Sequence, residues 1–213
     1  MIKIAPSILA ADPLHLERGV RRAVDAGCDW IHVDVMDAHF VPNLAYTPET
    51  VRRLNETFEV PLDVHLMMDH PETLLDAFLK AGADWVTVHA EIGNVSGLLD
   101  RIHDAGARAG VALRPGTPAE AALAYREKAD MILAMTVEPG FGGQKLDESV
   151  IRKIRDLREA GYDGEIEADG GIREDNLEML VQNGLSVAVM GTALFRNEHM
   201  KECISRLHAF KKC

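Results

Sequence analysis

Polar side chains that can bind metal ions alternate with aliphatic residues in two strand-like stretches of the sequence. Residues 31–40, IHVDVMDAHF, place His32 and Asp34 on the face opposite an Ile/Val/Val face, and residues 61–68, PLDVHLMM, place His65 in the same pattern. Side chains two positions apart point to the same face of a β-strand. Isolated ionised groups are costly to bury unless they are paired or bound to a metal. The two polar faces are therefore candidates for one functional site.

A third stretch of the sequence adds carboxylates to this set. Residues 165–171, EIEADGG, place Asp169 on one face with two glutamates. Taken singly, His32 fits a hydrogen-bonded core histidine, and Asp34 or Asp169 fits a buried cap or ion pair as well as it fits chemistry. Together with His65 they form a nitrogen and oxygen ligand set that suits one divalent zinc, iron, manganese or cobalt ion without indicating which. If the strand ends meet in the fold, a functional site is the better interpretation.

The elements that must position these side chains are marked by a recurring junction of glycine and an apolar run. It occurs at Gly27, Gly82, Gly106, Gly161 and Gly184. Glycine closes helix ends in a left-handed conformation, so each junction predicts a helix that ends before a strand begins. Apolar runs within residues 2–9, 58–66 and 126–135 complete a set of eight predicted strands. Amphipathic periodicity predicts helices within residues 13–27, 71–82 and 148–161.

Eight strands that alternate with helices over 213 residues predict one α/β domain, residues 1–213, folded as a (β/α)₈ TIM barrel. An open doubly wound sheet uses the same alternation and is the alternative. No GxGxxG motif follows the first predicted strand, which favours the barrel. In such barrels, inward side chains at the carboxyl ends of the strands reach the mouth where enzymes keep their chemistry.

Glycine-rich stretches follow the last three predicted strands and indicate an anion-binding site. They are PGFGGQ at residues 139–144, DGGI at 169–172 and MGTALF at 190–195. Glycines let backbone N–H groups approach a ligand, and the helices that start next direct positive partial charge toward it. The loops after the seventh and eighth strands are a recurrent phosphate site in this barrel. None of the three stretches contains lysine or arginine, so main-chain donors would hold a phosphate.

Methionines lie near the ends of three predicted strands, at Met36, Met67 and Met135. Their ordinary interpretation is core filling, because methionine adapts to irregular gaps. The functional interpretation is an apolar cap that excludes water from a reactive intermediate. His89, which faces inward on the fourth predicted strand, is interpreted as a core or rim histidine.

The composition favours a small-molecule partner. The chain carries 23 basic and 34 acidic residues, a formal charge of −11, without a basic block, which disfavours nucleic acids and anionic membrane surfaces. Cys28, Cys203 and Cys213 show no CxxC spacing, so neither a disulfide framework nor a thiolate zinc site is expected. We expect a cytoplasmic protein without a signal peptide or membrane span.

Five motifs carry a resemblance to a known family. PSILAAD, HVDVMDAHFVPN, LDVHLMM, VEPGFGGQ and EADGGI occur in this order over essentially the whole chain, which resembles the ribulose-phosphate 3-epimerase family. The resemblance implies a ribulose-phosphate-binding barrel that interconverts D-ribulose 5-phosphate and D-xylulose 5-phosphate in the pentose phosphate pathway. It also implies that His32, Asp34, His65 and Asp169 bind one divalent metal ion. Asp34 and Asp169 would transfer protons on the two faces of C3, through a metal-stabilised enediolate.

The resemblance also implies a set of substrate contacts, and the predicted barrel suggests an assembly. The implied substrate-binding residues are Ser7, His65, Gly140, Phe141, Gly142, Gly143, Asp169, Gly170, Gly171, Ile172, Gly191 and Thr192. Barrels of this kind often expose helices that pair with a second copy, so a homo-oligomer is expected.

The sequence departs from the family pattern at three positions. Ala38 and Arg114 stand where the family usually has glycine and asparagine, and Glu138 stands where asparagine is common. The PNL stretch at Pro42 and the MTV stretch at Met135 also resemble allulose-6-phosphate 3-epimerases. That sister activity on a ketohexose phosphate is the nearest alternative.

Two further alternatives belong to other classes of function. A sugar-phosphate decarboxylase of the orotidine-decarboxylase type would carry an Asp-x-Lys-x-x-Asp array, but the stretch HVDVMDAH at residues 32–39 lacks lysine. A non-enzymatic phosphate-binding barrel would need no four-ligand metal set.

Overall fold

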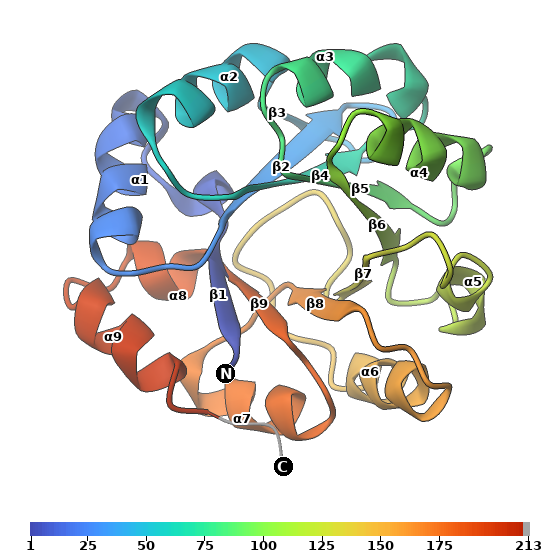
Figure 1. The fold of residues 1–213 in the computed structure, drawn as a ribbon. Helices are drawn as coiled ribbons and strands as arrows, with labels where there is room; N and C mark the ends of the chain where they lie inside the picture. The colour runs from blue at the N-terminus through green and yellow to red at the C-terminus, as the bar shows by residue number, and fades with distance from the viewer. Residues whose placement is uncertain (211–213) are drawn as a thin grey trace.

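The computed structural model describes residues 1–210, and within them the chain forms a ring of eight parallel strands surrounded by helices (Figure 1). The parallel strands are β1 (Lys3–Pro6), β2 (Ile31–Asp37), β4 (Leu62–Met67), β5 (Trp85–His89), β6 (Arg108–Leu113), β7 (Met131–Met135), β8 (Glu165–Asp169) and β9 (Val187–Met190). The short strand β3 (Leu44–Ala45) adds to β2 in antiparallel orientation. Each neighbour pair in the order β1-β9-β8-β7-β6-β5-β4-β2 is parallel.

The two ends of this strand order meet and close the barrel. Ser7, just after β1, forms a parallel bridge with His32 of β2. Nearer the amino ends, the N–H of Asp29 donates a 3.0 Å hydrogen bond to the carbonyl oxygen of Ile4. The predicted (β/α)₈ barrel is therefore confirmed.

The helices lie on the outside of the ring. They are α1 (Leu16–Asp25), α2 (Pro48–Thr57), α3 (Leu75–Lys80), α4 (Val95–Asp104), α5 (Glu120–Leu123), α6 (Val150–Glu159), α7 (Glu174–Gln182), α8 (Thr192–Phe195) and α9 (Met200–Leu207). Three single 3₁₀ turns add η1 (Ile8–Ala10), η2 (Pro13–His15) and η3 (Pro71–Thr73). Pro13 and Pro71, the first residues of two predicted helical ranges, fall in η2 and η3, which precede α1 and α3. The five junction glycines all adopt positive φ, from 79° to 106°, as expected of helix ends.

Alternation along β2 separates scaffold from site. Ile31, Val33 and Val35 are at most 3% exposed and pack in the core between sheet and helices. His32 and Asp34 point the other way, into the barrel. At the amino end of the interior, the rings of Trp30 and Trp85 lie with centroids 4.8 Å apart, in an apolar cluster that plugs the barrel. This apolar cluster lies on the amino-terminal side of His32 and Asp34 in the barrel interior.

Two expectations concern thiols and membranes. Cys28 and Cys203 are free thiols, and Cys213 lies outside the described residues. Among residues 1–210, the structure contains no helix with the length and apolar composition needed to span a bilayer.

The loop after β2 begins in a strained conformation at Ala38. Its φ is 61°, in the left-handed region that favours glycine. The loop is fixed around it, because Asp37 Oδ1 accepts hydrogen bonds from the N–H groups of His39 and Phe40, and the Ala38 N–H donates to the Asn43 carbonyl oxygen at 2.9 Å. Alanine at position 38 therefore stores backbone strain in a loop that these hydrogen bonds hold in place.

We predict that Ala38→Gly stabilises the protein. Relief of the left-handed conformation, about 1–2 kcal/mol, exceeds the extra unfolded-state entropy of glycine, so the free energy of unfolding should rise by about 0.5–1 kcal/mol in urea titrations. Ala105→Gly is the matched control, because Ala105 is exposed with φ −82° and glycine should there destabilise. A loss of stability in Ala38→Gly would contradict this assignment of strain.

Candidate active site

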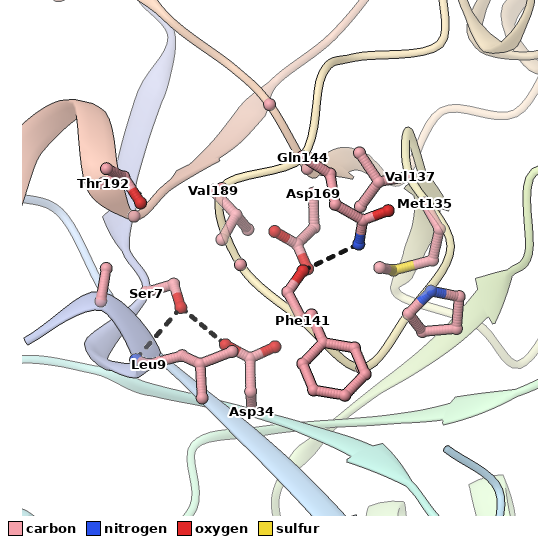
Figure 2. A pocket seen from close by; sticks show the side chains of 18 of the residues that line it. Ser7, Leu9, Asp34, Met135, Val137, Phe141, Gln144, Asp169, Val189 and Thr192 are labelled. Carbon is pink, nitrogen blue, oxygen red and sulfur yellow. Dashed lines mark hydrogen bonds between the residues drawn. The ribbon is translucent and has the colours of Figure 1, made fainter. Parts of the chain in front are cut away.

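A pocket opens at the carboxyl ends of the strands and contains most of the predicted site (Figure 2). All of the predicted substrate-binding residues except His65 line it: Ser7, Gly140, Phe141, Gly142, Gly143, Asp169, Gly170, Gly171, Ile172, Gly191 and Thr192. Asp34 also lines it, together with all three methionines of the predicted cap. Figure 2 shows Asp34 and Asp169 reaching the same space from β2 and β8, two strands that β1 and β9 separate.

The four predicted metal ligands meet at the floor of this pocket. His32, Asp34, His65 and Asp169 each bring one ligand atom to within 4.8 Å of the others. Asp34 Oδ1 lies 3.4 Å from His32 Nε2 and 3.8 Å from His65 Nδ1. The other oxygen, Oδ2, accepts a 2.6 Å hydrogen bond from the Ser7 hydroxyl. Ser7 therefore turns Oδ1 toward the two imidazoles.

The hydrogen bonds of the two histidines leave one nitrogen of each free. His32 Nδ1 lies 2.5 Å from Asp63 Oδ2, and His65 Nε2 lies 2.9 Å from His89 Nε2. The remaining nitrogens, His32 Nε2 and His65 Nδ1, are buried without a hydrogen-bond partner. Buried unpaired polar atoms are costly, and these two face a cluster of carboxylates. The donor set therefore fits a divalent cation with nitrogen and oxygen ligands.

The pKa values of the two aspartates are displaced in opposite directions. Burial acts to raise the pKa of Asp34, but the neighbouring imidazoles of His32 and His65 outweigh it and hold the pKa well below its usual range. Burial and then the negative charge of Asp34 raise the pKa of Asp169 to about 7. At neutral pH the site thus holds one ionised carboxylate and one that readily carries a proton.

Two glycines close the β8 side of the pocket where no other residue fits. A Cβ added to Gly171, whose φ is 65°, would lie 2.3 Å from the Leu146 backbone nitrogen. A Cβ on Gly170 would lie 2.4 Å from Val137. The loop after β7 therefore packs directly on the backbone after β8, which leaves main-chain groups at the pocket wall.

The helices that follow the three glycine stretches begin at different distances along the sequence from their glycines. Helix α7 begins at Glu174 and α8 at Thr192, close behind their glycines as expected, whereas α6 begins only at Val150. The intervening chain after β7 curls over the centre of the ring (Figure 1). Gln144 Nε2 donates to the carbonyl oxygens of Glu138 and Phe141, and Asn43 Nδ2 donates to that of Gly140. Residues 139–144 therefore do not start a helix. They form a cover over the pocket, which these hydrogen bonds hold in place.

The methionines and the cover form an apolar roof over the cluster. Met36, Met67 and Met135 are at most 4% exposed and line the pocket, so each serves both core and wall. Phe141, on the cover, is 55% exposed. The predicted cap residues are thus brought together at the site.

Sequence reasoning missed several pocket residues. Leu9, Val137, Gln144, Arg173 and Val189 also line the pocket. Gln144 and Arg173 belong to or directly follow the glycine motifs, so those motifs could have indicated them. Arg173 is the arginine among the residues that line the pocket. Its Nε donates a 3.0 Å hydrogen bond to Asp175 Oδ1, so the guanidinium is engaged in an ion pair.

Comparison with known proteins places the chain in a family. The model of the ribulose-phosphate 3 epimerase family matches residues 3–195. The chain belongs to this family. Ribulose-phosphate 3-epimerase from Bacillus subtilis (strain 168) is 40% identical over 217 residues, which cover 99% of this chain and 100% of that protein. The chloroplastic ribulose-5-phosphate-3-epimerase of Arabidopsis thaliana is 43% identical over 218 residues, 99% of this chain and 78% of that one.

More distant structures share the fold of this ribulose-phosphate 3-epimerase family member. The 3-hexulose-6-phosphate synthase of Salmonella typhimurium aligns with a TM-score of 0.73 at 18% identity, covering 97% of this chain and 96% of that one. The N-acetylmannosamine-6-phosphate 2-epimerase of Clostridium perfringens aligns with a TM-score of 0.69 at 17% identity, covering 95% and 92%.

We predict that Asp169→Asn stabilises the metal-free protein at neutral pH. The folded protein keeps a proton on Asp169 that an unfolded carboxyl releases near pH 4, so wild-type stability falls as pH rises from about 4 to about 7. Asparagine does not titrate, so the variant lacks this fall in stability. Its melting temperature should exceed that of wild type at pH 7.5 and approach it near pH 4.

Asp34→Asn is the matched control with the opposite sign. The depressed pKa of Asp34 stabilises the fold above the unfolded value, and this stability is lost as pH falls through the folded pKa. The variant should therefore be less stable than wild type at pH 7.5. Equal melting temperatures for Asp169→Asn and wild type at that pH would contradict the raised pKa.

Proposed function

We propose that this protein is a metal-dependent epimerase that interconverts D-ribulose 5-phosphate and D-xylulose 5-phosphate by proton transfer at C3. One observation carries the proposal. Asp34 and Asp169 enter a single pocket from β2 and β8, and they cluster within 4.8 Å with His32 and His65, each of which has one ring nitrogen without a hydrogen-bond partner. The family membership of the chain supports it.

His32, Asp34, His65 and Asp169 are the residues that would hold the divalent cation. When bound, the cation supplies Lewis-acid stabilisation of negative charge on substrate oxygens. His32 offers Nε2 and His65 offers Nδ1, because the other nitrogen of each ring is engaged in the interior. Asp34 offers Oδ1, while Ser7 holds its second oxygen.

The two aspartates are suited to opposite halves of the epimerisation. The C3 hydrogen of a 2-ketose phosphate is acidified by the adjacent ketone, and its removal gives an enediolate. Asp34, which its lowered pKa keeps ionised, is free to accept that proton, and Asp169, whose pKa is about 7, can return one on the other face. The reverse reaction exchanges the two roles.

The glycine loops are suited to the phosphate. Gly170, Gly171 and Gly191 border the pocket next to α7 and α8, where backbone N–H groups can approach an anion. Arg173 contributes little free charge there, because it pairs with Asp175. The cover around Phe141 would exclude water from the enediolate.

The activity test uses protein loaded with each candidate metal in deuterated buffer. D-ribulose 5-phosphate should yield D-xylulose 5-phosphate with deuterium at C3, and a chelator should abolish the reaction. D-allulose 6-phosphate, assayed in parallel, separates the sister activities by the ratio of kcat/KM values, which we expect to favour the pentulose. Absence of both product and exchange with every metal would refute the proposal.

Asp34→Asn and Asp169→Asn should each lower kcat by at least about 10²–10⁴-fold, the usual contribution of a general acid or base. The exposed Asp163, in the loop before β8, supplies the control Asp163→Asn, which should keep wild-type rates. Circular dichroism verifies that each variant folds. A near-normal kcat in either active-site variant would exclude that carboxylate as a proton carrier.

A further inference from the structure

A line of hydrogen bonds leads from His65 away from the pocket to Glu91. His65 Nε2 lies 2.9 Å from His89 Nε2, and His89 Nδ1 lies 2.9 Å from Glu91 Oε2. His65 and His89 are completely buried, whereas the Glu91 side chain is 21% exposed. The His89 ring lies outside the pocket, so it does not touch a ligand there. Its place in the line nevertheless determines how His65 can act.

The order of donors along this line has one solution when Glu91 is ionised and both buried imidazoles are neutral. A carboxylate only accepts hydrogen bonds, so the Nδ1 atom of His89 must carry the proton. The Nε2 atom of His89 then accepts, and the Nε2 atom of His65 must donate to it. This leaves the lone pair of His65 on Nδ1, the atom that faces Asp34 Oδ1 at 3.8 Å and has no hydrogen-bond partner.

Glu91 is held in the ionised form by its other contacts. Its Oε1 accepts a 2.8 Å hydrogen bond from the backbone N–H of Arg114 and another from the Thr117 hydroxyl. Burial acts to raise the pKa of Glu91, but the bonds from His89, Thr117 and Arg114 outweigh it and lower the pKa to about 2. Both carboxylate oxygens of Glu91 therefore accept hydrogen bonds, and the hydrogen-bonded line from Glu91 to His65 starts at a negatively charged group.

Packing fixes the position of the His89 ring as well. Phe40 covers it, with ring centroids 4.5 Å apart. The Arg114 guanidinium lies 4.1 Å above the Phe40 ring and donates a 2.9 Å hydrogen bond to the Phe40 carbonyl oxygen. Arg114, a departure from the family pattern, thus clamps the loop after β2 over His89 and shields it from water.

We propose that His89 is a positioning residue that, anchored by Glu91, holds His65 in the Nε2–H form so that Nδ1 is presented to the metal. This inference rests on the metal site of the proposed function, although it does not depend on which sugar phosphate is bound. Hydrogen bonds to the outer nitrogen of a ligating histidine generally fix its orientation, and their loss weakens metal binding about 10–100-fold. A core histidine that merely filled space would show no such dependence.

The test compares His89→Gln with His89→Leu in the full chain. The glutamine amide oxygen can accept the His65 N–H in place of the His89 ring, whereas leucine fills similar space without an acceptor. Nitrogen-15 NMR of the metal-free protein at neutral pH reports the protonated nitrogen of His65, with the signal assigned from its loss in His65→Asn. We expect the Nε2–H form in wild type and in His89→Gln, and loss of this preference in His89→Leu.

Metal affinity supplies the second measurement. Titration with Co²⁺ alone should give a dissociation constant about 10–100-fold higher for His89→Leu and within about threefold of wild type for His89→Gln. His103→Leu is the control, since His103 also pairs with a carboxylate, Asp130, at 2.8 Å, but on the surface away from the pocket. It should leave both readouts unchanged.

The outcomes separate this inference from the proposed function. An Nδ1–H form of His65 in wild type, or wild-type Co²⁺ affinity in His89→Leu, would overturn the role of His89 even if the enzyme epimerises its substrate. Conversely, a His89-dependent Co²⁺ affinity without epimerase activity would refute only the proposed function. If His89→Leu does not fold, His89→Asn replaces it, because its shorter amide stays near Glu91 and cannot reach His65.

Discussion

The structure depends on one constraint, that ionisable groups buried inside a closed barrel must be paired. His32, Asp63, His65, His89 and Glu167 all lie on inward faces with 0% exposure. Contacts across neighbouring strands pair the histidines, as in His32–Asp63 and His65–His89, whereas both oxygens of Glu167 lack a hydrogen-bond partner and burial raises the pKa of that carboxyl. The resulting hydrogen bonds run between strands and orient the side chains that reach the pocket. The same contacts that make burial tolerable therefore also arrange the site.

The carboxylates below the pocket show how the barrel limits its own charge. Glu167 lies beneath the cluster, and burial followed by the negative charge of Asp63 raises its pKa well above the usual range. Burial thus favours the neutral form of Glu167, and the direct partner of His32 is Asp63, whose Oδ2 lies 2.5 Å from His32 Nδ1. The contact with Asp63 turns the other ring nitrogen of His32, Nε2, toward Asp34 Oδ1, which lies 3.4 Å away.

The three departures from the family pattern alter the surroundings of the site and not its ligands. Ala38 strains the start of the loop after β2, and Arg114 holds the same loop through Phe40. The Glu138 carbonyl oxygen accepts a hydrogen bond from Gln144, a contact that any residue at position 138 could make with its backbone. Two of the departures thus act on one loop, which lies over His89. Ala38 and Arg114 therefore act on the site through the packing of this loop, whose Phe40 covers the His89 ring next to His65.

The sequence by itself determined the scaffold and the chemical types at the site, because these follow from local periodicity. Alternation along residues 31–37 predicts which side chains face inward, and glycine before each apolar run predicts where helices end. The sequence did not determine which nitrogen of His65 is free, or that His89 and Glu91 control it. Those properties depend on partners contributed by β5 and its following loop, and the pairing of β4 with β5 is what brings His65 within 2.9 Å of His89. Hydrogen-bond direction is decided by partners that are distant in the chain, and no local pattern encodes it.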